Sequence, residues 1–437
     1  MNRIKLGKLI RKVEGNKNKQ LKDLPLLGIN IDKEFMPSVA NTIGTDMSNY
    51  QIVKREQFAC NPMHLGRDER MPTALLLNQD EILVSPAYFV FEVIDKNIIL
   101  PEYLMLYFKQ PETDRLLWFK TDSSVRGGLG WNELCDIEIP VPDLQVQKDI
   151  IRQYNQISDA IKVKEKLNNN LEEQAQAIFK SWFVDYKPFG GIKPDSWNEI
   201  SFSDIADFIN GYSYQGDELQ ESNYAMATIK NFNRDGGFKL DGFKEIIPSN
   251  KLRKNQEVNI FDVLVAHTDL TQNAYVLGNA ELLLSKNKYE KIIMSMDLVK
   301  VTPKTNEIST FLLAAILKNK EFKTHCLRYK SGTTVLHLSK RALPEYRLTF
   351  PNNLEDIKPL EKILSEIYKT TAKNIEESAS LLKLRDTLLP KLMLENSDSS
   401  TAKLSFIITK IIYIILKLFK IIRCFMISCK FIFCPIS

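Results

Sequence analysis

The feature that most constrains the fold is a long stretch in which apolar residues recur every three or four positions. Its apolar positions are Ile150, Tyr154, Ile157, Ile161, Leu171, Ala175, Ile178 and Trp182. Continuing the same spacing through the gap reaches two polar residues, Lys164 and Asn168. A 3.5-residue repeat kept over about 35 residues predicts a helix whose apolar seam packs on another helix.

A second stretch near the other end of the chain has the same design. Its seam positions are Ile357, Leu360, Leu364, Ile367, Thr371, Asn374, Ser378, Leu381, Arg385, Leu388 and Leu392, so its middle is also polar. Both stretches follow a proline-containing lead-in, "IPVPDL" and "LTFPNNLED", which suits an extended segment before a helix. The matching design favours two helices packed on each other, although two separate surface helices would also satisfy the pattern.

The segments between these helices repeat as well. "NRIKLGKLI" aligns with "NEISFSDIA", "DEILVSPA" with "FDVLVAHT", "LPEYLMLYFK" with "ISTFLLAAIL", and "CDIEIPVP" with "PEYRLTFP". Ser123 and Ser331 also occupy equivalent glycine-containing turns. Five matches in the same order indicate two copies of one unit, a mixed domain followed by a long helix.

We therefore predict an α+β protein with two tandem mixed domains, whose long helices pack as an antiparallel coiled coil with pseudo-twofold symmetry. The expected boundaries are residues 1–142 and 188–352 for the domains, 143–187 and 353–396 for the helices, and 397–437 for a tail. In this arrangement the helices act as spacers.

Charge and cysteine content limit the class of protein. The tail after Ser400 holds six basic and no acidic residues, which leaves 53 basic and 54 acidic residues in the first 400. Composition alone therefore does not indicate nucleic acid binding. The six cysteines suggest no disulfide framework, and the basic N-terminal stretch lacks the apolar core of a signal peptide, so we expect a cytoplasmic protein.

A search for catalytic motifs finds none that is specific. The string nearest to an adenine methyltransferase motif is "NPMH", which fails at two positions, and "KSGTT" lacks the ending of a phosphate-binding loop. The four histidines are scattered, so we expect no metal. The adjacent His325 and Cys326 could form a nucleophile site, but neighbouring residues on a helix point in different directions, which argues against it.

The two helix ends, "LEEQAQAIFKSWFVDYKPFG" and "LLKLRDTLLPKLM", closely resemble those of type I restriction–modification specificity subunits. The lead-ins and "KPDSWNEISFSDIADFINGYSY" are similar too, and the resemblance covers residues 1 to about 395. It implies a non-catalytic subunit in which each domain reads one half of a split site in double-stranded DNA. It further implies that the helices set the spacing and dock two methyltransferase subunits, and that restriction subunits complete the complex. S-adenosylmethionine and ATP would bind to those partners and not to this chain.

Base-reading residues vary within that family, so candidates for DNA contact must be chosen by chemistry. Loops that combine hydroxyl, amide and cationic side chains suit phosphate and base-edge contacts. The candidates are Arg67, Arg70, Ser123, Ser124, Arg126, Lys230, Asn231, Asn233, Arg234, Lys330, Ser331, Thr333, Lys340 and Arg341. Ordinary solvated turns would explain the same residues.

The segment after Ser400 departs from the family pattern. Its apolar runs are interrupted by Lys410, Lys417, Lys420 and Arg423, which argues against a membrane-spanning helix. An interfacial helix, an added interaction segment or out-of-frame translation are the options, and the composition favours the last. Two other functions stay open: a coiled-coil interaction scaffold held at a membrane by this tail, and an enzyme with an unrecognised motif.

Overall fold

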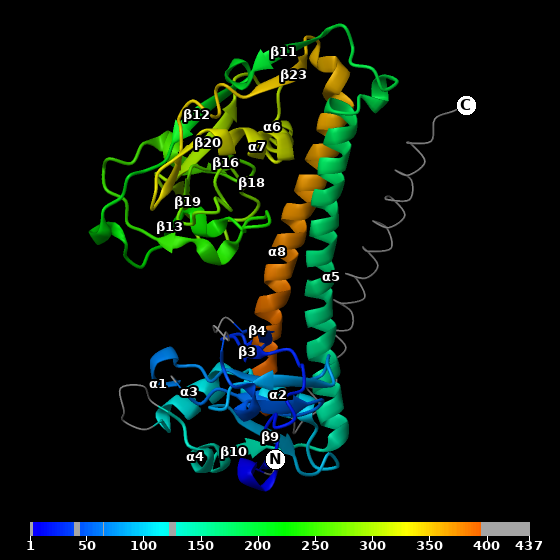
Figure 1. Cartoon of the computed structure of the whole chain (residues 1–437), viewed down its shortest axis with the longest axis vertical. Helices are drawn as coiled ribbons and strands as arrows, with labels where there is room; N and C mark the ends of the chain where they lie inside the picture. The colour runs from blue at the N-terminus through cyan, green and yellow to red at the C-terminus, as the bar shows by residue number, and fades with distance from the viewer. Residues whose placement is uncertain (1–2, 39–43, 64, 122–127, 395–437) are drawn as a thin grey trace. The chain divides into compact units, whose positions relative to one another are not determined.

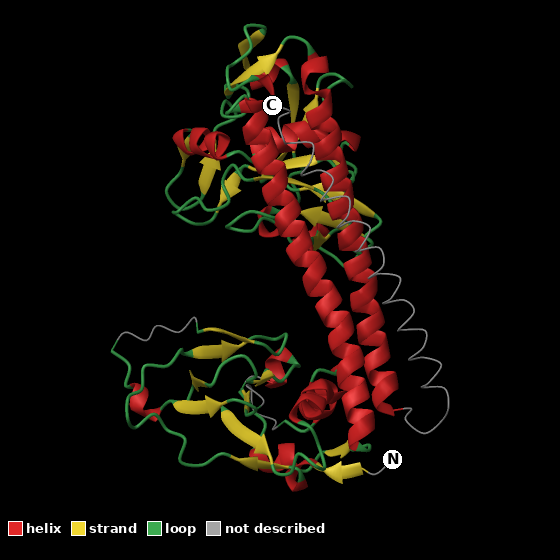
Figure 2. Cartoon of the chain, turned by 90° about the vertical axis from the view of Figure 1, so that its right-hand side faces the viewer, coloured by secondary structure: helices red, strands yellow, loops and turns green. Residues whose placement is uncertain are grey.

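A computed structural model describes residues 3–38, 44–63, 65–121 and 128–394 of the 437-residue chain. Two long helices dominate the described part, α5 (Leu144–Phe183) with 40 residues and α8 (Lys358–Leu394) with 37 (Figures 1 and 2). The chain divides into two compact units, and each takes a share of both helices. The first unit contains residues 1–160 and 381–437, and the second contains residues 161–380.

The globular part of the first unit is a mixed domain of short strands and helices. Its strands are β1 (Arg3–Lys5), β2 (Ile10–Lys12), β3 (Leu27–Ile29), β4 (Phe35–Pro37), β5 (Gln51–Lys54), β6 (Phe58–Cys60), β7 (Thr73–Leu75), β8 (Glu81–Val84), β9 (Phe89–Val93) and β10 (Glu138–Pro140). Its helices before α5 are α1 (Leu65–Asp68), α2 (Pro101–Phe108), α3 (Pro111–Phe119) and α4 (Trp131–Cys135). The largest sheet has the order β2-β9-β6-β7.

The second unit has the same kind of domain with longer loops. Its strands are β11 (Trp197–Ser201), β12 (Ala206–Asn210), β13 (Tyr224–Ala227), β14 (Lys244–Glu245), β15 (Glu257–Val258), β16 (Val263–Ala266), β17 (Thr268–Asp269), β18 (Ala280–Leu282), β19 (Lys291–Met294), β20 (Leu298–Pro303), β21 (Lys330–Ser331), β22 (Leu336–Leu338) and β23 (Arg347–Pro351). Its helices before α8 are α6 (Thr310–Leu317) and α7 (Lys320–Arg328). One of its sheets has the order β12-β20-β16-β18.

The two domains share one framework of strands. In each, the first strand pairs antiparallel with the last strand before the long helix, β1 with β10 and β11 with β23. A short 3₁₀ turn follows the first strand in each domain, and it begins with a fully buried residue, Leu6 or Phe202. The four-stranded sheets are antiparallel throughout and match in order, with β2, β9, β6 and β7 in the places of β12, β20, β16 and β18.

This topology corrects one of the sequence matches. "DEILVSPA" contains β8, whereas its proposed equivalent "FDVLVAHT" contains β16. Strand β16 takes the sheet position of β6, because β6 lies between β9 and the edge strand β7, and β16 lies between β20 and the edge strand β18. Strand β8 pairs instead with β5 in a separate ladder. Short buried strands share a similar apolar composition, so letter similarity selected the wrong partner.

The start of each long helix is attached to its domain by the same contact. Gln147 of α5 is fully buried, and its Oε1 accepts a hydrogen bond from the backbone N–H of Leu100 at 2.9 Å. Glu361 of α8 accepts one from the backbone N–H of Ser309 at 2.8 Å. Leu100 and Ser309 are the residues that precede α2 and α6, so each contact satisfies a free donor at a helix start.

The long helices contact each other within each unit. In the first unit the Arg385 guanidinium lies 5.3 Å from the centre of the Tyr154 ring. In the second unit the Tyr368 hydroxyl donates to Glu172 Oε1 at 3.4 Å. Residue numbers fall along α8 as they rise along α5, so the two helices run in opposite directions at these contacts. Leu171, Ala175, Leu360 and Leu364 are buried here in the core of the second unit.

The polar middles of the two seams meet inside the second unit. Asn374 Nδ2 donates to Asn168 Oδ1 at 2.8 Å, and Lys164 Nζ donates to Asn374 Oδ1 at 3.4 Å. Lys164 also pairs with Glu377. The exposed fractions of Lys164 and Asn374 are 3% and 4%, so these polar groups are buried between the helices as the seam pattern predicts.

Within the described residues, no helix is long and apolar enough to cross a membrane.

Candidate nucleic-acid interface

A hairpin in the second domain, together with the turn at its base, carries four of the predicted DNA contacts. It follows the 3₁₀ turn Ile229–Asn231, and a bridge between Phe232 and Phe238 closes it. The tip is residues 233–237, "NRDGG". Gly236 and Gly237 both have φ near +95°, a conformation that side-chain-bearing residues rarely adopt, so the two glycines permit this tight tip.

Within the hairpin the candidate residues have different surroundings. Asn231 has no exposed surface, because its Oδ1 accepts from the Thr228 N–H at 2.8 Å and its Nδ2 donates to the Lys239 carbonyl at 2.7 Å. It shapes the hairpin from inside. Arg234 is exposed at the tip, Asn233 is half-buried beside it, and Lys230 is exposed at the base.

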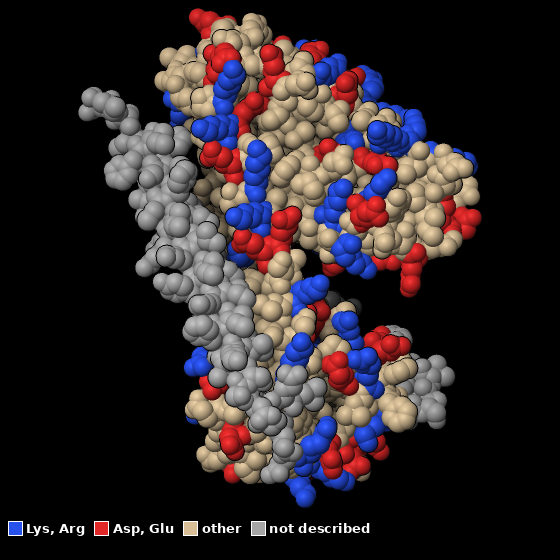
Figure 3. Space-filling model, turned by 180° about the vertical axis from the view of Figure 1, so that it is seen from behind, with Lys and Arg blue, Asp and Glu red and all other residues tan. Residues whose placement is uncertain are grey.

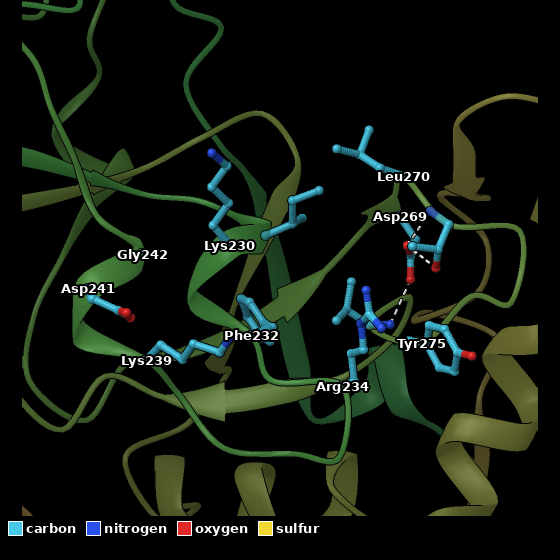
Figure 4. Close-up of a pocket in the computed structure, with 12 residues that line it drawn as sticks. Lys230, Phe232, Arg234, Lys239, Asp241, Gly242, Asp269, Leu270 and Tyr275 are labelled. Atoms are coloured by element: carbon cyan, nitrogen blue, oxygen red, sulfur yellow. Dashed lines mark hydrogen bonds between the residues drawn. The ribbon is translucent and has the colours of Figure 1, made fainter. Parts of the chain in front are cut away.

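The hairpin forms one wall of a cavity of about 390 Å³. The opposite wall is the loop 269–276, "DLTQNAYV". Figure 4 shows Arg234 beside Tyr275, and the guanidinium carbon lies 5.1 Å from the centre of that ring. Lys230, Arg234 and Lys239 supply three cations to this cavity, while Phe232 and Tyr275 supply aromatic faces.

Loop 269–276 keeps its shape through Asp269. This carboxylate accepts from the Thr271 N–H, the Thr271 hydroxyl and the Val276 N–H, each at 2.7 Å. Burial alone would raise the pKa of Asp269, but these hydrogen bonds outweigh it and the pKa is lowered. The Asp269 carboxylate therefore stays ionised, and Asp241 adds a second acidic side chain to the lining beside the three cations.

The same loop connects the hairpin to a second predicted stretch. Gln272 Nε2 donates to the backbone carbonyl of Thr333. Lys330, Ser331 and Thr333 are all exposed, and Lys330 and Ser331 form β21, which pairs with β22. The structure therefore brings the stretches 229–237 and 330–333 to the two sides of loop 269–276, which was not a candidate in the sequence. Its polar run "DLTQN" with an exposed Leu270 is the signal that could have identified it.

The remaining candidates of the second domain lie apart from the cavity lining. Arg341 is exposed and binds Glu345 at 2.5 Å, four residues along the chain. The Glu345 carboxylate, through its hydrogen bond and charge, raises the pKa of this guanidinium further. Lys340 is exposed next to it. An exposed ion pair of this kind adds little to stability, and it leaves Arg341 partly neutralised.

In the first domain the structure places two candidates and leaves others undescribed. Ser123, Ser124 and Arg126 lie outside the described residues. Arg67 belongs to α1, although its side chain lies outside what is described. Arg70 is exposed.

The residue after Arg70 is held by a buried ion pair. Asp114 Oδ1 accepts from the Met71 N–H at 3.1 Å and from Lys33 Nζ at 2.6 Å. Burial lowers the pKa of Lys33, and Asp114 partly compensates. Arg70 is thus an exposed cation on a segment anchored beneath it.

Charges of both signs are interspersed on the surface that Figure 3 shows. This agrees with the near balance of 53 basic and 54 acidic residues in the first 400, since a large basic face is absent from that view. Among the described residues no cluster of histidine, cysteine or acidic side chains could hold a metal ion. The cavity lined by Lys230, Arg234 and Lys239, with Asp241 and Asp269 also in its wall, is a candidate site for an acidic ligand in the second domain.

Comparison with known proteins agrees with this picture. Residues 66–173 match the sequence model of the type I restriction modification DNA specificity domain. The type I restriction enzyme HindI specificity subunit of Haemophilus influenzae is 25% identical over 378 residues, covering 72% of this chain and 81% of that protein. The MjaIX specificity subunit of Methanocaldococcus jannaschii is 22% identical over 323 residues, covering 69% and 70%.

Among solved structures, the type I restriction–modification S subunit from M. genitalium aligns over 91% of this chain and 96% of its own, with 15% identity and a TM-score of 0.48. The matched sequence domain and the two curated relatives agree with the resemblance of the helix ends. The comparisons therefore show that this chain is similar to the specificity subunits of type I restriction–modification systems.

Proposed function

We propose that this chain reads a bipartite DNA site, one half with each domain. The repeated order of elements supports this, because two copies of one sheet and one strand pair give two equivalent surfaces. The loops differ between the copies, so the two half-sites differ in sequence. In the second domain the reading surface is the cavity between hairpin tip 233–237 and loop 269–276.

The long helices form an antiparallel coiled coil that relates the two domains by a pseudo-twofold axis. The contacts of Tyr154 with Arg385 and of Glu172 with Tyr368, which run in opposite directions along the two helices, support this arrangement. The coil fixes the distance between the half-sites and provides the docking surface for two methyltransferase subunits. Two equivalent ends suit two copies of one partner.

Chemistry resides in the partners. Methyltransferase subunits carry S-adenosylmethionine and restriction subunits carry ATP, while this chain contributes recognition. The similarity of the chain to type I specificity subunits supports this division of labour. Because the target is cellular DNA, the complex works in the cytoplasm.

One observation carries the proposal: Lys230, Arg234 and Lys239 line a cavity with two aromatic faces, in a chain similar to type I specificity subunits. Cations at such positions bind phosphates and base edges. The test uses the full chain with its methyltransferase subunits and a random DNA library. We expect one bipartite motif to be methylated.

The cavity is tested by Arg234→Ala combined with Lys239→Ala. If both cations bind phosphates, the slope of log affinity against log salt should become less steep by about 0.9 for each phosphate that is no longer neutralised. Arg347→Ala is the matched control, because Arg347 is an exposed cation on β23 of the same domain, with a weak pairing to Glu199 at 3.8 Å, and lies outside the cavity. Equal effects of the cavity and control variants would refute this assignment, and a complex that methylates no motif would refute the function.

A further inference from the structure

A lysine buried beneath the cavity bridges two carboxylates from different parts of the second unit. Lys318 follows the last residue of α6, and its side chain is 12% exposed. Its Nζ lies 2.6 Å from Glu281 Oε2 on β18 and 3.0 Å from Glu172 Oε2 on α5. Burial would lower the pKa of Lys318, but Glu281 and Glu172 outweigh burial and raise it, so the lysine stays charged.

On one side, the contacts of Lys318 lead to hairpin tip 233–237. Glu281 is 5% exposed, and its other oxygen accepts the backbone N–H of Gly237 at 2.6 Å. Gly237 is the last residue of the tip that carries Arg234. A second contact from the same strand region holds the start of the tip, because Asn279 Nδ2 donates to the Asn233 carbonyl at 3.2 Å.

On the other side the contacts lead to both long helices. Glu172 belongs to α5, and its Oε1 accepts from the hydroxyl of Tyr368 on α8 at 3.4 Å. Tyr368 is 1% exposed, and burial raises the pKa of its hydroxyl, so it remains a donor. A continuous series of polar contacts therefore runs from α8 through α5, Lys318 and Glu281 to the hairpin tip.

Stability alone explains this arrangement poorly. Removing charges from water costs several kcal/mol for each ion, and apolar residues of similar volume often replace a buried ion pair without loss. Hydrogen bonds to charged groups are directional, in contrast to apolar contacts, so they fix orientation. Each group here has a defined partner, and the last partner is a backbone N–H whose position sets the direction of the tip.

We infer that Lys318 and Glu281 are positioning residues that fix the orientation of hairpin tip 233–237 relative to the helix pair, and thereby determine how strictly the second domain reads its half-site. This inference rests on the proposed function. Neither residue touches DNA in this role. Arg234 contacts the DNA, and the buried pair of Lys318 and Glu281 fixes the orientation of the hairpin tip that carries it.

The test compares Lys318→Met with Lys300→Met in the full chain. Lys300 is a matched control, because it is also a buried lysine of the second unit, bound to the Glu257 carbonyl at 2.7 Å and to Asp262 at 3.3 Å, with both partners away from the hairpin. Hydrogen exchange of the segment 231–239 is measured without DNA. We expect at least tenfold faster exchange of the Gly237 amide in Lys318→Met and no such change in Lys300→Met.

Half-site selectivity is then measured in the complex with methyltransferase subunits on a random DNA library. Lys318→Met should lower discrimination at the second half-site at least tenfold and leave the first unchanged. Lys318→Met combined with Glu281→Met replaces the whole pair with apolar residues, which should keep the fold while still freeing Gly237. Equal exchange in the lysine variants, or equal relaxation of both half-sites, would overturn the inference. The exchange measurement decides it even if the wild-type complex methylates no motif, a result that overturns the proposed function separately.

Discussion

Asn374 on α8 donates a hydrogen bond through its Nδ2 to Asn168 Oδ1 on α5 at 2.8 Å, at a point where apolar residues would pack more simply. The other amide atom of Asn374 accepts from Lys164, which is buried and also bound to Glu377. A shift of one helix along the other would separate all of these partners. The polar middle of the seam therefore favours one register of the two helices.

The first prediction concerns this amide pair. Asn374→Leu alone should lower the free energy of unfolding by roughly 1–3 kcal/mol, because it removes the donor to the Asn168 carbonyl and one of the acceptors of Lys164. Asn168→Leu combined with Asn374→Leu should recover most of this difference, since both polar groups are removed together. Denaturant unfolding of the full chain measures both values.

The double variant should also bind DNA with less discrimination between sites of different spacing, because an apolar seam tolerates several registers. Binding to a series of oligonucleotides with different gaps tests this. A double variant that is less stable than the single variant, with unchanged spacing preference, would contradict the role given to the pair.

Much of the helical scaffold could be predicted from the sequence, because it depends on local periodicity. The seam positions placed Lys164 and Asn168 opposite the polar middle of the second helix, and the structure confirms that they meet there. The repeat of Leu6 and Phe202 as the buried first residues of short turns was also predictable, since both follow an apolar strand residue at the same spacing.

The candidate cavity was harder to predict, because it depends on contacts between distant segments. Loop 269–276 lines the cavity opposite Arg234, about 40 residues earlier, and it contacts Thr333, about 60 residues later, which periodicity cannot reveal. Asn231 carries the right chemistry for DNA, yet its amide closes the hairpin from inside. The residue type indicates which groups a side chain can bind, whereas its burial in the fold determines whether the side chain can contact DNA.

The second prediction concerns exchange of the second domain. Replacing residues 188–352 by the corresponding segment of another specificity subunit should change only one half of the methylated motif. The exchanged segment contains both β11 and β23, so the strand pair that closes the domain is transferred intact. Sequencing of methylated sites measures the motif, and a change in both halves would show that the domains do not read independently.

The third prediction concerns spacing. A heptad inserted after Asn168, with a matching heptad before Asn374, lengthens both helices at the same level by about 10 Å. The gap between the half-sites should grow by about 3 base pairs, at ~3.4 Å for each. Insertion into α5 alone is the control and should disturb the register and lower stability. If the variant with a heptad in both helices still methylates sites with the original gap, the helices do not set the distance between the half-sites.

The fourth prediction concerns acid stability. Burial first, and then the nearby His337 and Lys340, lower the pKa of His267 to about 4 from an ordinary value of 6.5. The unfolded chain therefore binds this proton more readily than the folded chain, and stability should fall as pH decreases from 6.5 to 4. His267→Gln should remove roughly 2–3 kcal/mol of that fall.

Urea unfolding at several pH values measures the effect. Above pH 7 the difference in stability between His267→Gln and the wild type should be constant, because the histidine is neutral in both states there. Parallel curves down to pH 4 would show that His267 titrates alike in the folded and unfolded chain.

The pairing of each domain's first strand with its last has a consequence for biosynthesis. Strand β10 ends at Pro140, so the first domain can close before α5 has left the ribosome. Roughly 175 further residues are synthesised between the end of α5 and the start of α8. At ~5–20 residues per second, this synthesis takes on the order of 10–35 s. During that interval the apolar seam of α5 lacks the helix that covers it. Lys164 and Asn168 interrupt the seam at its middle. They therefore reduce the exposed apolar surface through which the nascent chain could bind chaperones or other nascent chains on the same messenger RNA.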